Sequence, residues 1–195
     1  MCVHYYGPSQ DMLKEYEGGR KSFSAPYRDI FPGKTAPVYF FEDGRRKLGE
    51  LIWGFPVDWT EKPVFNTRLE SGLEGKKMWR EAFEKRRIIL PTLGFYEPHS
   101  SLMVPSPKAG RLIKQQYLFN QGSKLFFMAA IYEEDYFSLI TTPPNSVVAK
   151  VHDRMPLVLN EDEIGLWLGG EGEYFLDRDG IELEASPKYP EPLIF

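Results

Sequence analysis

The chain has 195 residues, of which 42% are hydrophobic and 15% aromatic, and it carries a formal net charge of −4. This composition is typical of one globular domain with a sizeable core, and the negative charge argues against a protein that coats nucleic acid along its whole surface. No apolar run approaches the ~20 residues of a membrane span, and no signal peptide is expected. The one cysteine cannot form an internal disulfide, which suits a reducing cytosol.

The first half of the chain predicts short strands and one helix. We expect irregular chain over 3–24 with a break at Gly18-Gly19, strands over 36–41 and 48–55 around a hairpin turn at Asp43-Gly44, and a loop over 56–64. The spacing of Met78, Trp79, Ala82 and Phe83 predicts a helix over 76–87. The basic residues Lys85, Arg86 and Arg87 then form its solvated end.

The second half predicts more strands in sequence. We expect strands over 88–91 and 94–97 with an end at Pro98, a mostly irregular stretch over 99–123, an antiparallel pair over 125–132 and 136–142, a short helix ending at Lys150, a strand over 157–159, a helix over 161–168 with Asn160 as its N-cap, and a hairpin of 174–176 with 181–183. The sum is an α+β fold. We expect one domain over 1–195, with a largely antiparallel, bifurcated or barrel-like sheet and a few short flanking helices.

The position of Cys2 is chemically unusual. Removal of Met1 would give Cys2 a free amine beside its thiol, and this 1,2-aminothiol condenses with an aldehyde to an imine that the thiol closes to a thiazolidine. An α-amino group titrates near pH ~7.7–8.0, so a useful fraction is neutral in the cell. The alternative is that Cys2 is only a small hydrophobic residue at a frayed end.

Few other residues suggest chemistry. Glu97 ends an apolar strand, where burial would raise its pKa toward values useful in acid–base catalysis, although pairing with an arginine is as good an interpretation. Asn66 and Arg68 would share one face of a strand, or else form a turn and a surface cation. The three histidines, His4, His99 and His152, each have a structural alternative.

Motifs for cofactor and metal sites are missing from the sequence. There is no glycine-rich phosphate loop followed by Lys and Ser or Thr, no His-Glu-x-x-His, and no cysteine pair that could bind zinc. We therefore expect neither a metal nor a cofactor.

Five stretches together resemble the SOS-response-associated peptidase (SRAP) family, whose members crosslink to abasic sites in single-stranded DNA. They are Met1-Cys2, Trp53-Gly54-Phe55-Pro56 with Trp59, Asn66-Thr67-Arg68-Leu69-Glu70, Gly94-Phe95-Tyr96-Glu97, and the segment from His152 to Leu159. Their order and spacing agree from residue 1 to about 168. Two positions depart from the pattern: Val3-His4 replaces the usual Gly-Arg, and Pro98 replaces an aromatic residue.

The resemblance implies a role for each matching residue. Cys2 would be the nucleophile, and Asn66 would hold its amine and the sugar. Glu97 would open the closed deoxyribose to its aldehyde, and His152 would shuttle protons. The DNA path would be lined by three further residues, with guanidinium groups on phosphates and an indole near the flanking base or the core: Arg68, Arg154 and Trp53.

The resemblance therefore predicts a monomeric, cytoplasmic DNA-damage protein, nucleoid-associated if bacterial, that binds single-stranded DNA and forms a thiazolidine with abasic sites. It also implies a thiol peptidase that removes residues ahead of the cysteine. Two alternatives stay open: a Cys-His-Glu peptidase that cleaves other substrates, and a non-covalent single-strand binder in which Cys2 is incidental.

Overall fold

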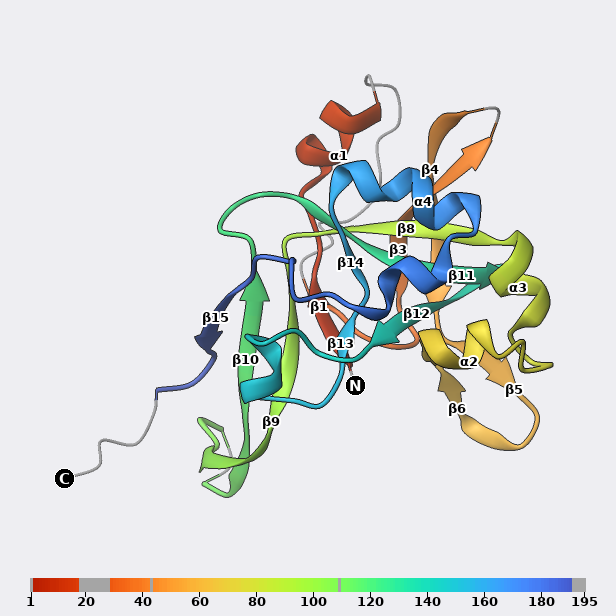
Figure 1. Cartoon of the computed structure of the whole chain (residues 1–195). Helices are drawn as coiled ribbons and strands as arrows, with labels where there is room; N and C mark the ends of the chain where they lie inside the picture. The colour runs from red at the N-terminus through yellow and green to blue at the C-terminus, as the bar shows by residue number, and fades with distance from the viewer. Residues whose placement is uncertain (1, 18–28, 43, 109, 191–195) are drawn as a thin grey trace.

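The computed structural model describes residues 2–17, 29–42, 44–108 and 110–190 (Figure 1). Strands dominate, and the helices are short. The helical elements are α1 (Gln10–Glu17), α2 (Leu69–Leu73), α3 (Arg80–Lys85) and α4 (Ile164–Gly169), with 3₁₀ turns η1 (Val148–Lys150), η2 (Glu161–Glu163) and η3 (Gly172–Leu176). No helix within these described ranges is long and apolar enough to cross a membrane.

The larger sheet curls into a ring. Its order is β13-β12-β4-β3-β8-β11-β14, with β7 beside β12, and a direct β11–β12 pairing brings the two arms together. The seam between β3 and β8 is thin, with one paired position at Tyr39 and Ile89. Its strands are β3 (Thr35–Glu42), β4 (Arg45–Trp53), β7 (Asn66–Arg68), β8 (Arg87–Thr92), β11 (Phe126–Glu133), β12 (Tyr136–Thr142), β13 (Met155–Pro156) and β14 (Val158–Leu159).

A second sheet carries the N-terminal strand. Its order is β15-β10-β9-β1-β2, and all its pairings are antiparallel. The strands are β1 (His4–Tyr6), β2 (Asp29–Ile30), β9 (Gly94–Pro105), β10 (Leu112–Asn120) and β15 (Glu184–Pro187), and a separate hairpin joins β5 (Phe55–Val57) to β6 (Thr60–Val64). The predicted α+β class with a largely antiparallel, barrel-like sheet is confirmed.

The core is aromatic. Trp53, Tyr39 and Phe137 have no exposed surface, and the rings of Trp53 and Phe137 stack 6.2 Å apart. Each such side chain stabilises the fold by about 1.5–3 kcal/mol relative to an exposed position. The strand prediction is most accurate in this core, because a continuous apolar run such as 126–132 is stable only when it is buried on both faces of a sheet.

Several predicted elements are confirmed. The strands over 36–41 and 48–55 match β3 and β4, whose register places Glu42 opposite Arg45 as a hairpin requires; within its turn, Asp43 lies outside the described residues. The antiparallel pair β11–β12 and the helical segment after Asn160 are also present.

The helix predicted over 76–87 is wrong in extent. Residues 77–79 form a turn, and α3 spans only Arg80–Lys85. Arg87 joins β8 instead, with its guanidinium 4.4 Å from the ring centroids of both Phe83 and Trp167 and a 2.8 Å hydrogen bond to the Trp167 carbonyl oxygen. Arg87 is therefore not a solvated helix end, and burial lowers its pKa to about 10.

Other boundaries moved for tertiary reasons. Pro98 does not end its strand, and the stretch over 99–123 is not mostly irregular. β9 continues to Pro105 and pairs with β10, and the register shifts between Lys114 and Gln116. Residues 3–24 are not all irregular, since β1 and α1 form within them, and residues 18–24 with the Gly18-Gly19 break lie outside the described part. The loop expected over 56–64 is instead the β5–β6 hairpin.

The tail hairpin expected from 174–183 is absent. Residues 172–176 form η3, because Phe175 is fully buried against Trp167 and Arg178 makes a buried ion pair with Glu163 at 2.6 Å. These contacts hold the segment against the ring of strands, and only Glu184–Pro187 form a strand, which pairs with β10.

Candidate active site

Cys2 lies at the junction of the two sheets. It stands two residues before the start of β1, which pairs with β9 so that His4 is opposite Tyr96. Asn66 comes from β7 of the other sheet, and its Nδ2 donates a 2.7 Å hydrogen bond to the Cys2 carbonyl oxygen. Cys2 has no exposed surface. A side chain 64 positions away thus fixes the backbone of the predicted nucleophile.

Side chains alternate between the two faces along β7, so Thr67 lies on the opposite face from Asn66 and Arg68. Thr67 is buried, and its hydroxyl lies 2.8 Å from that of Ser138. Arg68 is exposed at the end of the strand, on the same side as Asn66. The predicted strand at Asn66 and Arg68 is confirmed.

Glu97 is buried completely on β9. Burial raises the pKa of its carboxyl to about 7, because the charged form loses its hydration. A carboxyl with this pKa holds and releases a proton at cellular pH, as general acid–base catalysis requires. The alternative in which Glu97 pairs with an arginine is not what the structure shows: no arginine lies within ion-pair distance of it among the described residues.

His152 faces this carboxyl. Its Nε2 lies 3.9 Å from Glu97 Oε2, and its side chain is 16% exposed. Its Nδ1 lies 3.1 Å from the backbone nitrogen of Arg154, 3.2 Å from the Arg154 carbonyl oxygen and 3.1 Å from Asp153 Oδ1, so the neighbouring backbone and carboxylate hold the ring in place. Burial lowers the pKa of His152, so the ring is largely neutral at pH 7 and able to accept a proton.

The Cys2 thiol is protonated in this setting. Burial, and next the negative charge of Glu97, raise the pKa of the thiol well above its ordinary value. Sγ lies 3.5 Å from the His4 carbonyl oxygen, to which the S–H donates. The structure therefore brings Cys2, Asn66, Glu97 and His152 together at one site.

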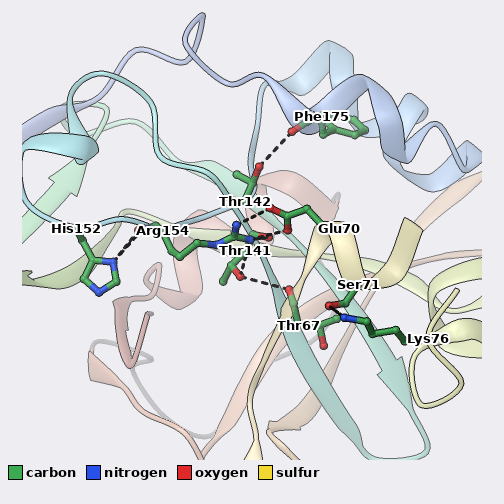
Figure 2. Close-up of polar contacts among 9 residues, drawn as sticks. All are labelled: Thr67, Glu70, Ser71, Lys76, Thr141, Thr142, His152, Arg154 and Phe175. Atoms are coloured by element: carbon green, nitrogen blue, oxygen red, sulfur yellow. Dashed lines mark hydrogen bonds and ion pairs between the residues drawn. The ribbon is translucent and has the colours of Figure 1, made fainter. Parts of the chain in front are cut away.

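The Arg154 side chain points away from His152 and toward Glu70 (Figure 2). Its guanidinium binds Glu70 through two hydrogen bonds of 2.6 and 2.9 Å and donates a third, of 2.7 Å, to the Thr141 carbonyl oxygen. The hydrogen bonds from Arg154 lower the pKa of Glu70. Sequence reasoning gave Glu70 no role, although it stands two positions after Arg68.

Trp53 belongs to the core. It has no exposed surface, its Nε1 donates a 2.7 Å hydrogen bond to the Phe65 carbonyl oxygen, and its ring lies 5.2 Å from that of Tyr5. Of the two places named for this indole, the structure has it in the core rather than beside a flanking base.

The remaining histidines have structural partners. His4 Nε2 lies 2.6 Å from Asp29 Oδ1, and His99 Nδ1 accepts from the backbone N–H groups of Ser101 and Leu102 at 3.1 and 2.9 Å. Within the described residues, no three His, Cys, Asp or Glu side chains gather as ligands for a metal ion.

Comparison with known proteins places this chain in a family. The sequence model for "SOS response associated peptidase (SRAP)" matches residues 1–179. The abasic site processing protein YoqW of Bacillus subtilis is 27% identical over 157 residues, which cover 73% of this chain and 66% of YoqW. This chain thus spans just under two thirds of YoqW. The abasic site processing protein YedK of Escherichia coli is 24% identical over 171 residues, covering 83% of this chain and 72% of YedK.

Solved structures share the fold. A protein from Bordetella bronchiseptica superposes with a TM-score of 0.75 at 18% identity, over 97% of this chain and all of that chain. A protein from Bacteroides thetaiotaomicron gives a TM-score of 0.69 at 20% identity, over 95% of this chain and 91% of that chain. With the family match across residues 1–179, the conclusion is plain: this chain belongs to the SOS response associated peptidase family.

Proposed function

We propose that this protein, once Met1 is removed, forms a covalent thiazolidine with the ring-opened aldehyde of an abasic site in single-stranded DNA and so shields the lesion. The observation that carries the proposal is the meeting of Cys2 and Asn66 with a fully buried carboxyl, Glu97, whose pKa is about 7. Relatives named as abasic site processing proteins support the same substrate.

The chemistry begins with the sugar. The closed hemiacetal of an abasic deoxyribose has no aldehyde, and opening it requires proton transfer to the ring oxygen and from the hydroxyl. Glu97 has the pKa for both transfers, and His152 Nε2 lies 3.9 Å from its Oε2, so a small approach or one bridging water lets the two groups exchange a proton. Because a lesion without a base has little stacking to lose, its entry into the site costs little.

Bond formation then follows in two balanced steps. The Cys2 amine adds to the aldehyde carbon and expels one water to give an imine. The thiol next adds across the C=N bond, with its proton going to nitrogen, and closes the five-membered ring. Asn66 fixes the Cys2 backbone for both attacks. Ring closure saturates the carbon, which removes the electron sink for β-elimination, so the strand stays intact.

The peptidase in the family name has a place in this scheme. Hydrolysis of the Met1–Cys2 bond consumes one water and releases methionine together with the amine that the crosslink needs. We propose that this self-processing is the peptidase activity of the protein, and that Cys2, Glu97 and His152 serve both reactions.

Intact mass spectrometry tests the proposal. The protein is mixed with a single-stranded oligonucleotide carrying one abasic site, and the spectrum is expected to show the protein without Met1 joined to the oligonucleotide, at the summed mass less one water. Cys2→Ala is expected to give no heat-stable adduct. Cys2→Ser lacks the thiol that closes the ring, so when it is prepared with Met1 already removed its adduct is expected only when the imine is trapped by borohydride.

Other results would point elsewhere. A heat-stable adduct in Cys2→Ala would exclude the thiazolidine. Equal affinity of wild type for intact and abasic strands, with no adduct from a Met1-free preparation, would indicate a non-covalent single-strand binder.

A further inference from the structure

Three aromatic rings stack next to the site. The His4 ring lies between Phe31 and Tyr96, with centroid distances of 4.3 and 4.2 Å and interplanar angles of 14° and 9°. His4 and Tyr96 are opposite each other in the β1–β9 ladder, and Phe31 directly follows β2. The chain thus builds a nearly parallel column of three rings across neighbouring segments of one sheet.

The column is held in place at its centre and open at one end. Asp29 binds His4 Nε2 at 2.6 Å and fixes the plane of the imidazole, which is 5% exposed. Phe31 packs one face on His4, and yet 44% of its surface is exposed. An exposed ring at the end of a rigid column is a surface on which another flat ring can stack.

Two lysines accompany the rings. A pocket of about 290 Å³ is lined by His4 and Phe31 together with Lys114 and Lys188. The Lys188 ammonium lies 4.6 Å from the Tyr96 ring centroid. Neither lysine forms an ion pair with a residue of the described ranges, so both charges are available to an anion.

The segment that carries Lys188 is firmly anchored. The backbone N–H of Lys188 donates a 2.7 Å hydrogen bond to the Gln116 carbonyl oxygen. The side chain of Gln115 is fully buried and holds Tyr189, the residue after Lys188, through two hydrogen bonds. Its Nε2 donates to the Tyr189 carbonyl oxygen at 2.8 Å, and its Oε1 accepts from the Tyr189 N–H at 3.2 Å. The cation is therefore held beside the ring column rather than on a loose tail.

The pocket lies within reach of the reaction site. Val3 lines it and is bonded to Cys2, and His4 is two residues along, which is about 7 Å of extended chain. That distance corresponds to about two stacked nucleotides at 3.4 Å each. Lys114, which also lines the pocket, is close enough that its charge lowers the pKa of His152.

We propose that Phe31, supported by His4 and Tyr96, is a stacking platform for the base of a nucleotide that flanks the abasic site, and that Lys114 and Lys188 bind the phosphates beside it. This rests on the proposed function for the identity of the strand and deepens it by adding a nucleotide subsite.

The test measures non-covalent binding, so it does not depend on crosslink chemistry. The probe is a single-stranded oligonucleotide with a central tetrahydrofuran, an abasic analogue that has no aldehyde. In two further probes the base is also removed from the nucleotide directly 5′ or directly 3′ of it. Dissociation constants are measured for wild type, Phe31→Ala and the control Tyr174→Ala, which truncates an aromatic residue that is 57% exposed on η3.

We expect loss of one flanking base to weaken wild-type binding by roughly 5- to 100-fold, and Phe31→Ala to weaken binding of the intact probe by a similar factor. The two losses should not add, because both remove the same contact. Lys188→Ala should reduce the slope of log affinity against log salt by about 0.7, whereas the exposed Lys77→Ala should leave it unchanged.

Two results would overturn the platform: Phe31→Ala that binds every probe as wild type does, or losses from base removal and from Phe31→Ala that multiply fully. A parallel reaction of wild type with an authentic abasic oligonucleotide separates this from the proposed function. If wild type forms the adduct but the losses from base removal and from Phe31→Ala are independent, the stacking platform is excluded and the crosslinking stands. If the two losses overlap but no adduct forms, the crosslinking is excluded and the platform stands.

Discussion

Two carboxylates on either side of the 152–154 segment have opposite environments. Glu70 meets the Arg154 guanidinium through two hydrogen bonds, which lower its pKa. Glu97 is fully buried with a neutral imidazole 3.9 Å away, and burial raises its pKa to about 7. The same short segment thus supplies Arg154, whose charge keeps Glu70 ionised, and His152, whose neutral ring leaves Glu97 able to exchange protons. A carboxylate held by a guanidinium stays ionised and suits a structural role, whereas a buried carboxyl with a pKa of about 7 suits proton transfer.

The largest expected effect comes from removing the proton exchange. Glu97→Gln keeps the shape of the side chain but cannot transfer a proton, so the rate of adduct formation with an abasic oligonucleotide should fall by about 10²–10⁴-fold. Gel-resolved time courses from pH 5 to 9 measure it, and the inflection near pH 7 in the wild-type rate should be missing from the variant. An unchanged rate with the inflection intact would show that Glu97 is not the acid–base group.

The next largest effect concerns the structural carboxylate. Glu70→Gln leaves the largely buried Arg154 without its counter-charge, and we expect a loss of about 3 kcal/mol in the free energy of unfolding. This is the low end for a buried pair, because the Glu70 side chain is 35% exposed. Urea unfolding at pH 7 measures it.

The matched control for that loss is Glu81→Gln. Glu81 also pairs with an arginine, Arg86, at 3.0 Å, but its side chain is 65% exposed. Exposed pairs contribute at most about 1 kcal/mol, so this variant should unfold almost as wild type does. Equal losses in the two variants would mean that burial does not distinguish the Glu70 pair.

The last expected effect is a gain in stability at alkaline pH. A Glu97 pKa of about 7, against an ordinary value near 4.5, means that the folded state binds the extra proton between these pH values, so wild-type stability falls as pH rises through this window. Glu97→Gln cannot ionise and should be more stable than wild type by about 3 kcal/mol at pH 8. The difference should vanish below about pH 4.5. Urea titrations at pH 4.5 and 8 measure it, and a variant that is less stable at pH 8 would contradict it.

Local sequence predicted some elements well and others poorly. The strands of the ring follow from apolar runs with only one way to be buried, and the β3–β4 hairpin follows from its turn residues. The predicted helix over 76–87 does not extend to Arg87, because Arg87 contacts Trp167, 80 positions away, and the tail hairpin does not form, because Arg178 pairs with Glu163. Each error involves a partner that local periodicity cannot reveal.

The candidate site was foreseen in part. The resemblance named Cys2, Asn66, Glu97 and His152, and the structure brings these four together. It also named Arg154 for phosphates, whereas that guanidinium binds Glu70, 84 positions away. The ring column at Phe31 was not anticipated, because its three rings come from separate segments and only one of them, Tyr96, lay in a recognised motif.

The sequence by itself determined which reactive groups the chain owns. It placed one cysteine at position 2, supplied no metal-binding pattern, and set the strands through their apolar runs. Tertiary structure alone decided what state those groups are in. The pKa of Glu97, the partner of Arg154 and the hold of Asn66 on Cys2 all depend on side chains from distant segments. Burial and electrostatic partners are properties of the packed chain, and no local pattern carries them.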